Sequence, residues 1–288
     1  MGVTISGRLV TGQGQGASFT RLPWAREQFL ARLGIDPYPG TLNLVLDEAD
    51  ARSSWEALRA RPGEPIEPPE PGFCAARCYR VRLEGWLPGA IVLPEVPGYP
   101  TSQVEVISAL PLRETLSRSD GDCISLEASD PLRVRGVLFD VDGTLVDSLG
   151  AFRVAAAGVV PGLRETLEAL RGRAVCLGIA TGSDEASCEP LHREGLMGYF
   201  AAAVTGGDVE PRKPNPGVLL ECAAALGVEP PEAVYVGDTP LDIAAAKAAG
   251  MAAVAVLTGA GDSALLSRSG PDRIIASVAL LPDLLEVP

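Results

Sequence analysis

The chain contains very little histidine and lysine, and this scarcity excludes several kinds of site. His192 is the one histidine, Lys213 and Lys247 are the two lysines, and every other basic residue is an arginine. A metal centre built from several histidines is therefore excluded. A catalytic triad would have to use His192, but no nucleophile motif accompanies it, so a surface histidine is the simpler interpretation.

The sequence also lacks a long apolar run and a basic patch. No run approaches the ~18 residues that are needed to span a bilayer, and the N-terminus carries no signal-peptide pattern. The formal net charge is −13, which argues against binding to nucleic acid. We therefore expect neither a membrane nor a nucleic acid as a partner, and nothing indicates the oligomeric state.

Six cysteines are present, but their spacings match no zinc site. Cys176 and Cys222 lie in apolar runs, which is typical of thiols in a protein core. A reducing, cytoplasmic setting is the simplest interpretation of this cysteine usage.

The length of the chain and the change of sequence pattern along it predict two domains, residues 1–130 and 131–288. In the first, Pro and Gly separate short β-like runs at residues 4–10, 42–46, 78–83, 90–93, 104–107 and 123–126. An amphipathic helix is expected at residues 23–33, with Gly34 as its stop. Many short strands with frequent turns predict a small β-barrel. The Pro-rich residues 61–72 are interpreted as a long surface loop between strands.

Three stretches of the first domain could carry chemistry. Residues 12–16 form a Gly-rich loop that could bring backbone N–H groups close to phosphates, although a plain hairpin loop fits as well. Thr41 and Asn43 offer neutral oxygens two residues apart, which suit Mg²⁺ when a nucleotide supplies the negative charge, or they form a turn into a strand. Glu105 lies inside a strand-like run, where it could deprotonate a hydroxyl or face solvent.

Together these stretches resemble the archaeal-type riboflavin kinase, a cradle-loop barrel that uses CTP as its phosphate donor. The resemblance implies that riboflavin and CTP are substrates, that Thr41 and Asn43 hold Mg²⁺, and that Glu105 contacts the ribityl end of the flavin. The flavin-contacting threonine of the family has only a poorly spaced counterpart, Thr101, so a degenerate binding domain is the alternative. The positions implied to hold the nucleotide are Gly12, Gly14, Gly16, Ala17, Leu110, Pro111, Leu112 and Arg113.

In the second domain, acidic and hydroxyl residues follow successive apolar runs. Asp140 and Asp142 come directly after residues 137–139, Thr181 follows residues 174–180, and Asp238 follows residues 233–236. Because the carboxyl ends of parallel strands converge at one edge of a sheet, we expect these side chains to cluster. Lys213 is expected to join them, since a compact ammonium suits a phosphate in a chain that otherwise avoids lysine. Lys247 is interpreted as an exposed helix residue.

The physical logic of such a cluster is phosphoryl transfer. A phosphate carries roughly two negative charges near neutral pH, so an anionic nucleophile needs a cation to approach it. Mg²⁺ prefers oxygen ligands and would bridge Asp140, Asp238 and a phosphate oxygen. Lys213 and the hydroxyl of Thr181 would hold the remaining oxygens.

The four motifs around these residues resemble the haloacid-dehalogenase-like (HAD) phosphatases, which have a Rossmann-like α/β core with a parallel sheet. The resemblance implies that Asp140 is the nucleophile and forms an aspartyl-phosphate. It implies that Asp142 is the general acid and base and a metal ligand through its backbone carbonyl. The backbone N–H groups of Gly182 and Ser183 would bind phosphate. Asp238 would complete the metal site, with Asp242 as a second acidic position beside it.

Many members of this superfamily carry a cap domain between the first and second motifs, but the interval from Thr144 to Thr181 is too short to hold one. The sequence therefore predicts a capless core that acts on a phosphate monoester in an open site. Three functions stay open. The phosphatase could act on 5-amino-6-ribitylamino-uracil 5′-phosphate, earlier in the pathway that the kinase completes; it could hydrolyse FMN; or it could be a general sugar-phosphate or phosphoglycolate phosphatase attached to a non-catalytic flavin- or nucleotide-binding module.

Overall fold

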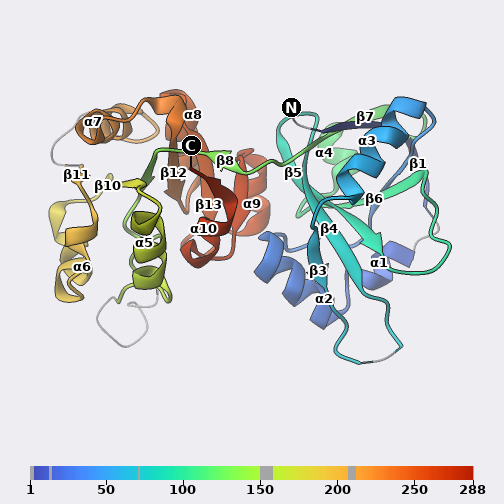
Figure 1. The fold of residues 1–288 in the computed structure, drawn as a ribbon, viewed down its shortest axis with the longest axis horizontal. Helices are drawn as coiled ribbons and strands as arrows, with labels where there is room; N and C mark the ends of the chain where they lie inside the picture. Colours follow the sequence, from blue (N-terminus) through green and yellow to red (C-terminus); the bar gives the residue numbers. More distant parts are fainter. Residues whose placement is uncertain (1–2, 13–14, 71, 150–157, 207–211, 288) are drawn as a thin grey trace. The chain divides into compact units, whose positions relative to one another are not determined.

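The computed structural model describes residues 3–12, 15–70, 72–149, 158–206 and 212–287. The chain divides into two compact units, Met1–Asp130 and Pro131–Pro288, and each is described by itself (Figure 1). Among the described residues, none of the helices combines the length and the apolar character that a bilayer crossing requires.

The first unit is built around a closed antiparallel barrel (Figure 1). Six strands are neighbours in the order β4-β5-β6-β2-β1-β7, and β4 pairs in turn with β7, which closes the barrel. Inward and outward residues alternate along β1, as expected for a sheet with one buried face. The predicted small β-barrel is therefore confirmed. The strands are β1 (Thr4–Val10), β2 (Leu42–Val45), β4 (Ala76–Leu83), β5 (Leu87–Pro94), β6 (Gln103–Ile107) and β7 (Cys123–Ala128).

The Pro-rich segment at residues 61–72 contains a further strand, so its interpretation as a surface loop was wrong. Strand β3 (Glu64–Ile66) pairs with the first residues of β4, on the edge whose far end pairs with β7. Ile66 is fully buried, in a cluster with Phe29 and Leu33. The burial of this isoleucine stabilises a strand that the flanking prolines hide in the sequence.

The predicted helix at residues 23–33 is present in two parts. Helix α2 (Pro23–Gln28) continues into a π-helical turn, η1 (Phe29–Leu33), which ends at Gly34 with φ of 69°. Helix α3 (Ala49–Arg59) was not predicted, and it buries Ala51, Trp55 and Leu58 on one face. Two shorter helices complete the unit, α1 (Gln15–Phe19) and α4 (Leu112–Leu116).

The second unit contains a six-stranded parallel sheet with the order β11-β10-β9-β12-β13-β14. From β9 the chain moves outward through β10 and β11, then returns to the other side of β9 with β12. Parallel sheets with this reversal bind ligands at the carboxyl ends of the strands beside the switch point. The strands are β9 (Gly136–Phe139), β10 (Cys176–Ala180), β11 (Ala202–Val204), β12 (Ala233–Gly237), β13 (Ala252–Val256) and β14 (Arg273–Ile275).

Helices cover both faces of this sheet, which confirms the predicted Rossmann-like α/β core (Figure 1). Phe139 packs with the helices of one face and Leu138 with those of the other. On the first face lie α5 (Leu163–Gly172), α6 (Glu189–Arg193) and α10 (Leu281–Leu284); on the second lie α7 (Gly217–Leu226), α8 (Pro240–Ala249) and α9 (Ser263–Arg268). The unit also contains the pair β8 (Leu132–Arg133) and β15 (Leu285–Glu286), and the 3₁₀ turns η3 (Glu185–Cys188), η4 (Met197–Tyr199), η5 (Pro230–Glu232) and η6 (Val278–Leu280).

Candidate functional site

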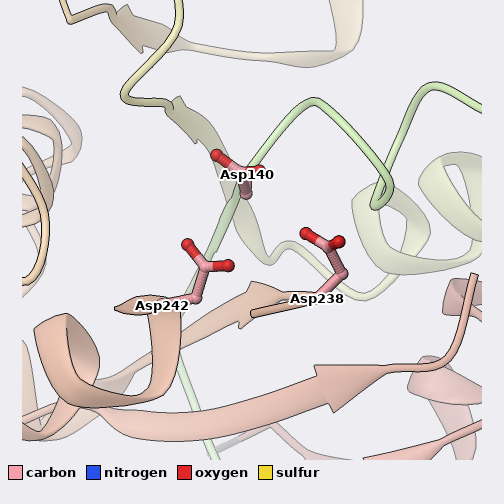
Figure 2. A group of neighbouring side chains, drawn as sticks. All are labelled: Asp140, Asp238 and Asp242. Atoms are coloured by element: carbon pink, nitrogen blue, oxygen red, sulfur yellow. The ribbon is translucent and has the colours of Figure 1, made fainter. Parts of the chain in front are cut away.

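Three buried carboxylates meet at the carboxyl edge of the parallel sheet (Figure 2). Asp140 follows β9 directly, and Asp238 follows β12, its neighbour in the sheet. Asp242 comes from the first turn of α8. The three residues are 6%, 3% and 2% exposed, and one oxygen of each lies within 4.8 Å of the others.

Lys213 binds two of these carboxylates. Its Nζ donates hydrogen bonds to Asp140 Oδ1 at 2.7 Å, to Asp242 Oδ1 at 2.6 Å and to the hydroxyl of Tyr235 at 2.9 Å. The Tyr235 hydroxyl donates in turn to the carbonyl of Ala180 at 2.7 Å. The ammonium group is therefore held by acceptors from three different elements of the fold.

Asp242 is fully engaged by these contacts. Its Oδ1 accepts from Lys213, and its Oδ2 accepts from the backbone N–H of Thr239 at 2.9 Å and from the Thr239 hydroxyl at 2.6 Å. The contact with the Thr239 N–H belongs to a capping box that begins α8, and its reciprocal bond runs from the backbone N–H of Asp242 to Thr239 Oγ1 at 3.3 Å. Asp242 thus fixes both the helix start and Lys213, which leaves Asp140 and Asp238 as the better carboxylate ligands for a metal.

The cluster carries more negative than positive charge. Burial raises the pKa of Asp140 to about 6, against the opposing effect of Lys213. Burial also raises the pKa of Asp238. Burial alone would lower the pKa of Lys213, but Asp140 and Asp242 outweigh it and the pKa is raised. Lys213 balances the charge of one of the three carboxylates. The other two are hard oxygen donors whose charge is not compensated, and this donor set fits a divalent cation such as Mg²⁺.

Glycines allow the backbone to pass close to Asp238. A Cβ added to Gly143 would come 2.5 Å from Asp238 Oδ2, and the φ of Gly143 is +73°. The backbone N–H of Ala260 donates to Asp238 Oδ2 at 2.7 Å. The hydrogen bond from Ala260 orients the Asp238 carboxylate, and a side chain at residue 143 would collide with it.

The other residues predicted for this site lie next to the cluster of three carboxylates. Asp142 is half-buried and accepts a hydrogen bond of 2.7 Å from the hydroxyl of Ser183. The backbone N–H of Ser183, expected to bind phosphate, donates here to Thr181 Oγ1 at 3.1 Å. Thr181 is fully buried. A cavity of about 290 Å³ opens over Asp140, Asp142, Gly143, Ser148, Leu149, Gly182, Ser183, Lys213, Asp238, Thr239, Leu241, Asp242 and Ala260.

In the first unit the structure brings Thr41, Asn43 and Glu105 together. Asn43 on β2 and Glu105 on β6 are register partners. Thr41 Oγ1 donates to Glu105 Oε2 at 3.0 Å, and Asn43 Nδ2 donates to the carbonyl of Thr41 at 3.1 Å. The Thr41 hydroxyl donates its proton to Glu105 and accepts from Asn43 Nδ2 at 3.3 Å, so one of its lone pairs remains for a cation, which fits the predicted Mg²⁺ site.

Gly12 and Gly16, at the two ends of the Gly-rich loop, pack directly on Asn43 and Thr41. A Cβ added to Gly12 would lie 2.4 Å from Asn43 Nδ2, and one added to Gly16 would lie 2.4 Å from Thr41 Oγ1. Larger residues would therefore push the loop away from the polar cluster. Ala17 lies in α1, while Gly14 is outside the described residues.

The predicted segment 110–113 lies on the same side of the barrel as Thr41. Leu110, Pro111, Leu112 and Arg113 line a cavity of about 220 Å³ together with Thr41. Arg113 donates to the carbonyl of Val10 at 2.9 Å, which ties this segment to the end of β1.

Two tyrosines in these sites were not predicted. Tyr235 stands in an apolar run that reads as core, and only the fold shows that its hydroxyl reaches Lys213. The hydroxyl of Tyr99 donates to Glu105 Oε1 at 2.8 Å, and burial raises the pKa of Tyr99 well above its usual range. Tyr99 also lines a cavity of about 340 Å³ with Arg59, Arg77 and Tyr79. The residue of this loop that reaches Glu105 is Tyr99, two positions before Thr101.

Comparison with known proteins gives a separate match for each unit. The family model for the CTP-dependent riboflavin kinase domain, described as domain of unknown function DUF120, matches residues 9–128. The family described as haloacid dehalogenase-like hydrolase matches residues 154–256.

Individual relatives follow the same division. A riboflavin kinase of Methanocella arvoryzae is 40% identical over 118 residues, which are 40% of this chain and 52% of that protein. A phosphoglycolate phosphatase of Chromobacterium violaceum is 36% identical over 161 residues, which are 56% of this chain and 69% of that protein. The crystal structure of a predicted phosphoglycolate phosphatase from Haemophilus somnus matches 52% of this chain and 97% of its own, with a TM-score of 0.48 and 21% identity.

The second unit is an α/β unit with a site at the switch point of a parallel sheet, and the first is a closed barrel with a polar cluster under a Gly-rich loop. The chain belongs to the haloacid dehalogenase-like hydrolases. Its N-terminal unit matches the family model of the CTP-dependent riboflavin kinase domain. The chain spans about half the length of the curated Methanocella arvoryzae riboflavin kinase that it matches.

Proposed function

We propose that this chain is a bifunctional enzyme of riboflavin and FMN metabolism, a CTP-dependent riboflavin kinase joined to a Mg²⁺-dependent phosphatase. The observation that carries the phosphatase proposal is the ion pair between Lys213 Nζ and Asp140 Oδ1 at 2.7 Å. It holds a buried carboxylate in one orientation at the floor of a cavity, which is what a nucleophile requires.

In the proposed phosphatase reaction, a carboxylate oxygen of Asp140 attacks the phosphorus of a phosphate monoester. A new O–P bond forms, the ester O–P bond breaks, and Asp142 gives its proton to the departing oxygen. Water then attacks the aspartyl-phosphate, and Asp142 takes up its proton. Inorganic phosphate leaves and the Asp140 carboxylate is restored.

Residues around this pair have supporting roles. Lys213 and the backbone N–H of Gly182 would bind the phosphate oxygens, and the backbone N–H of Ser183 would join them by exchanging its bond to Thr181 Oγ1 for one to phosphate. The Ser183 hydroxyl orients Asp142. A magnesium ion, held by Asp140, Asp238 and the backbone carbonyl of Asp142, would supply the positive charge that lets an anionic nucleophile approach an anionic phosphate.

In the proposed kinase reaction, Glu105 takes the proton of the riboflavin 5′-hydroxyl. The hydroxyl oxygen attacks the γ-phosphorus of CTP, the bond from that phosphorus to the β–γ bridging oxygen breaks, and CDP leaves with FMN as the product. Thr41 and Asn43 would hold the Mg²⁺ that accompanies the nucleotide, and the Gly-rich loop and residues 110–113 would hold CTP. The contact between Glu105 and the Thr41 hydroxyl supports this assignment, since it places the base beside the metal ligands.

For the phosphatase we favour 5-amino-6-ribitylamino-uracil 5′-phosphate as the substrate. Two steps of one pathway then share a chain, whereas opposed activities on FMN would risk a futile cycle. FMN is the second candidate. The third is a general sugar-phosphate or phosphoglycolate phosphatase with a non-catalytic binding module, and the names of the phosphatase relatives favour it.

The test is phosphate release from these three substrates with Mg²⁺, for the wild type and Asp140→Asn, together with FMN formation from riboflavin and CTP. We expect the substitution to abolish phosphate release and to leave the kinase unchanged. Phosphate release that survived Asp140→Asn would overturn the mechanism. If FMN formed with neither CTP nor ATP, the first unit would be a binding module and not a kinase.

A further inference from the structure

Two exposed leucines line the phosphatase cavity beside its polar floor. Leu149 belongs to the loop that follows the proposed nucleophile, and its side chain is 47% exposed. Leu241 is the second residue of α8 and is 52% exposed. The other lining residues are mostly acidic, hydroxyl-bearing or small. Exposed apolar side chains at the opening of a polar pocket offer a contact surface for the organic part of a ligand.

The charges of the same cavity restrict that organic part. Four lining residues are carboxylic acids, namely Asp140, Asp142, Asp238 and Asp242, and Lys213 is the one basic residue among the described lining residues. Lys213 is already bound to Asp140 and Asp242 and lies at the phosphate end. A second anionic group on the substrate would therefore meet carboxylates and find no basic partner among these residues.

We infer that the phosphatase selects monoesters whose organic group is uncharged and has an apolar or planar part, which Leu149 and Leu241 contact. This inference rests on the proposed phosphatase function and names its substrate class. It disfavours phosphoglycolate, whose organic group is a carboxylate, although relatives bear that name. It favours a phosphate monoester whose organic group is an uncharged polyol that ends in a heterocyclic ring.

The charge part is tested with a matched pair of small esters, 2-hydroxyethyl phosphate and 2-phosphoglycolate. They differ only in that a CH₂OH group replaces the carboxylate. We expect kcat/KM to be at least about tenfold higher for the uncharged ester, because the unpaired charge would be desolvated beside carboxylates. Equal values, or a preference for phosphoglycolate, would overturn the inference.

The leucine part is tested with n-butyl phosphate against 2-hydroxyethyl phosphate. We expect the wild type to prefer the butyl ester, and Leu149→Ser and Leu241→Ser each to lower the ratio of the two kcat/KM values by roughly 3- to 10-fold. Leu220→Ser is the matched control, because Leu220 is a leucine of α7 that is 40% exposed and lies outside the cavity lining. A ratio that both cavity variants leave at the wild-type value would overturn the role of the leucines.

Failure of the underlying proposal has a different signature. If none of the three esters released phosphate in an Asp140-dependent way, the phosphatase function itself would be wrong, and this inference with it. If release depended on Asp140 but phosphoglycolate were preferred, only the substrate class would be wrong.

Discussion

The two candidate sites differ in where the charge for binding a metal comes from. In the second unit, Asp140, Asp238 and Asp242 are almost completely buried around a single ammonium. In the first unit, Glu105 is half-buried beside the neutral side chains of Thr41 and Asn43. The proposed phosphatase site therefore carries its own negative charge before any substrate arrives, whereas the proposed kinase site would depend on the phosphates of a nucleotide to bind a metal.

The largest effect should come from changing the cation that holds the phosphatase cluster. Lys213→Arg should lower phosphatase turnover by roughly 100- to 1000-fold, because a planar guanidinium cannot donate to three convergent acceptors as the compact ammonium does. Phosphate release from the preferred ester is the measurement.

The chain provides a matched control for this substitution. Lys247 is the other lysine, exposed on α8, with its Nζ donating to the carbonyl of Ser269. Lys247→Arg should leave phosphatase turnover unchanged. Equal losses in the two variants would mean that the fold, and not the three-acceptor geometry at Lys213, requires lysine.

A metal titration without substrate tests directly whether the two sites differ in their ability to bind Mg²⁺ alone. We expect calorimetry to detect one Mg²⁺ site in the free protein, and Asp238→Asn to weaken it by about 10- to 100-fold, because a well-oriented carboxylate ligand is lost. Thr41→Val should not alter this titration. Two sites in the free protein, one of them abolished by Thr41→Val, would show that the kinase site also binds metal without a nucleotide.

The strands and the placement of the phosphatase residues followed from simple patterns. The alternation along residues 4–10 has the period of a half-buried strand, and the polar residues after three apolar runs lie at the carboxyl edge of the sheet because parallel neighbours end there together. Asp140 and Asp238 could therefore be brought together from the sequence alone.

Other features depend on contacts that the sequence pattern does not encode. Helix α3 is mostly polar, and its three buried residues gain their environment only from the barrel. In the sequence Tyr235 has the pattern of a core residue, and only the tertiary structure shows that its hydroxyl accepts a hydrogen bond from Lys213. Asp242 was expected only as a second acidic position beside Asp238; its role in the helix start could also have been predicted, because Thr239 and Asp242 have the spacing of a capping box. Its second contact, to Lys213, needed the tertiary structure.

The pH dependence of stability should distinguish the two units. Burial raises the pKa of Asp140 from the ordinary carboxyl value of 3.8 to about 6 in the folded protein. A raised carboxyl pKa gives a contribution to stability that is complete below the unfolded value and is lost as the pH rises through the folded one. Without metal, Asp140→Asn should therefore stabilise the second unit by about 3 kcal/mol at pH 8 and by little near pH 4.

Calorimetry with EDTA is the measurement for this effect. Trp24, Trp55 and Trp86 are the three tryptophans and all lie in the first unit, so tryptophan fluorescence follows the first unit and serves as an internal control. The fluorescence transition should not change. An Asp140→Asn variant that matched the wild type at both pH values would contradict the burial cost assigned to this carboxylate.

The smallest expected effect concerns Tyr99, the counterpart of Tyr235 in the kinase site. Both tyrosines hold a charged group through a hydroxyl, but Glu105 keeps a second donor, Thr41, when Tyr99 is changed. Tyr99→Phe retains the ring that lines the neighbouring cavity and removes only the hydrogen bond. The proposed base should then be less well oriented, and the kcat of FMN formation should fall by about tenfold, with the KM for CTP nearly unchanged and phosphatase turnover in the same chain unaffected. An unchanged kcat with a raised KM for riboflavin would instead assign Tyr99 to binding the flavin, and the orientation of Glu105 would then depend on Thr41 alone.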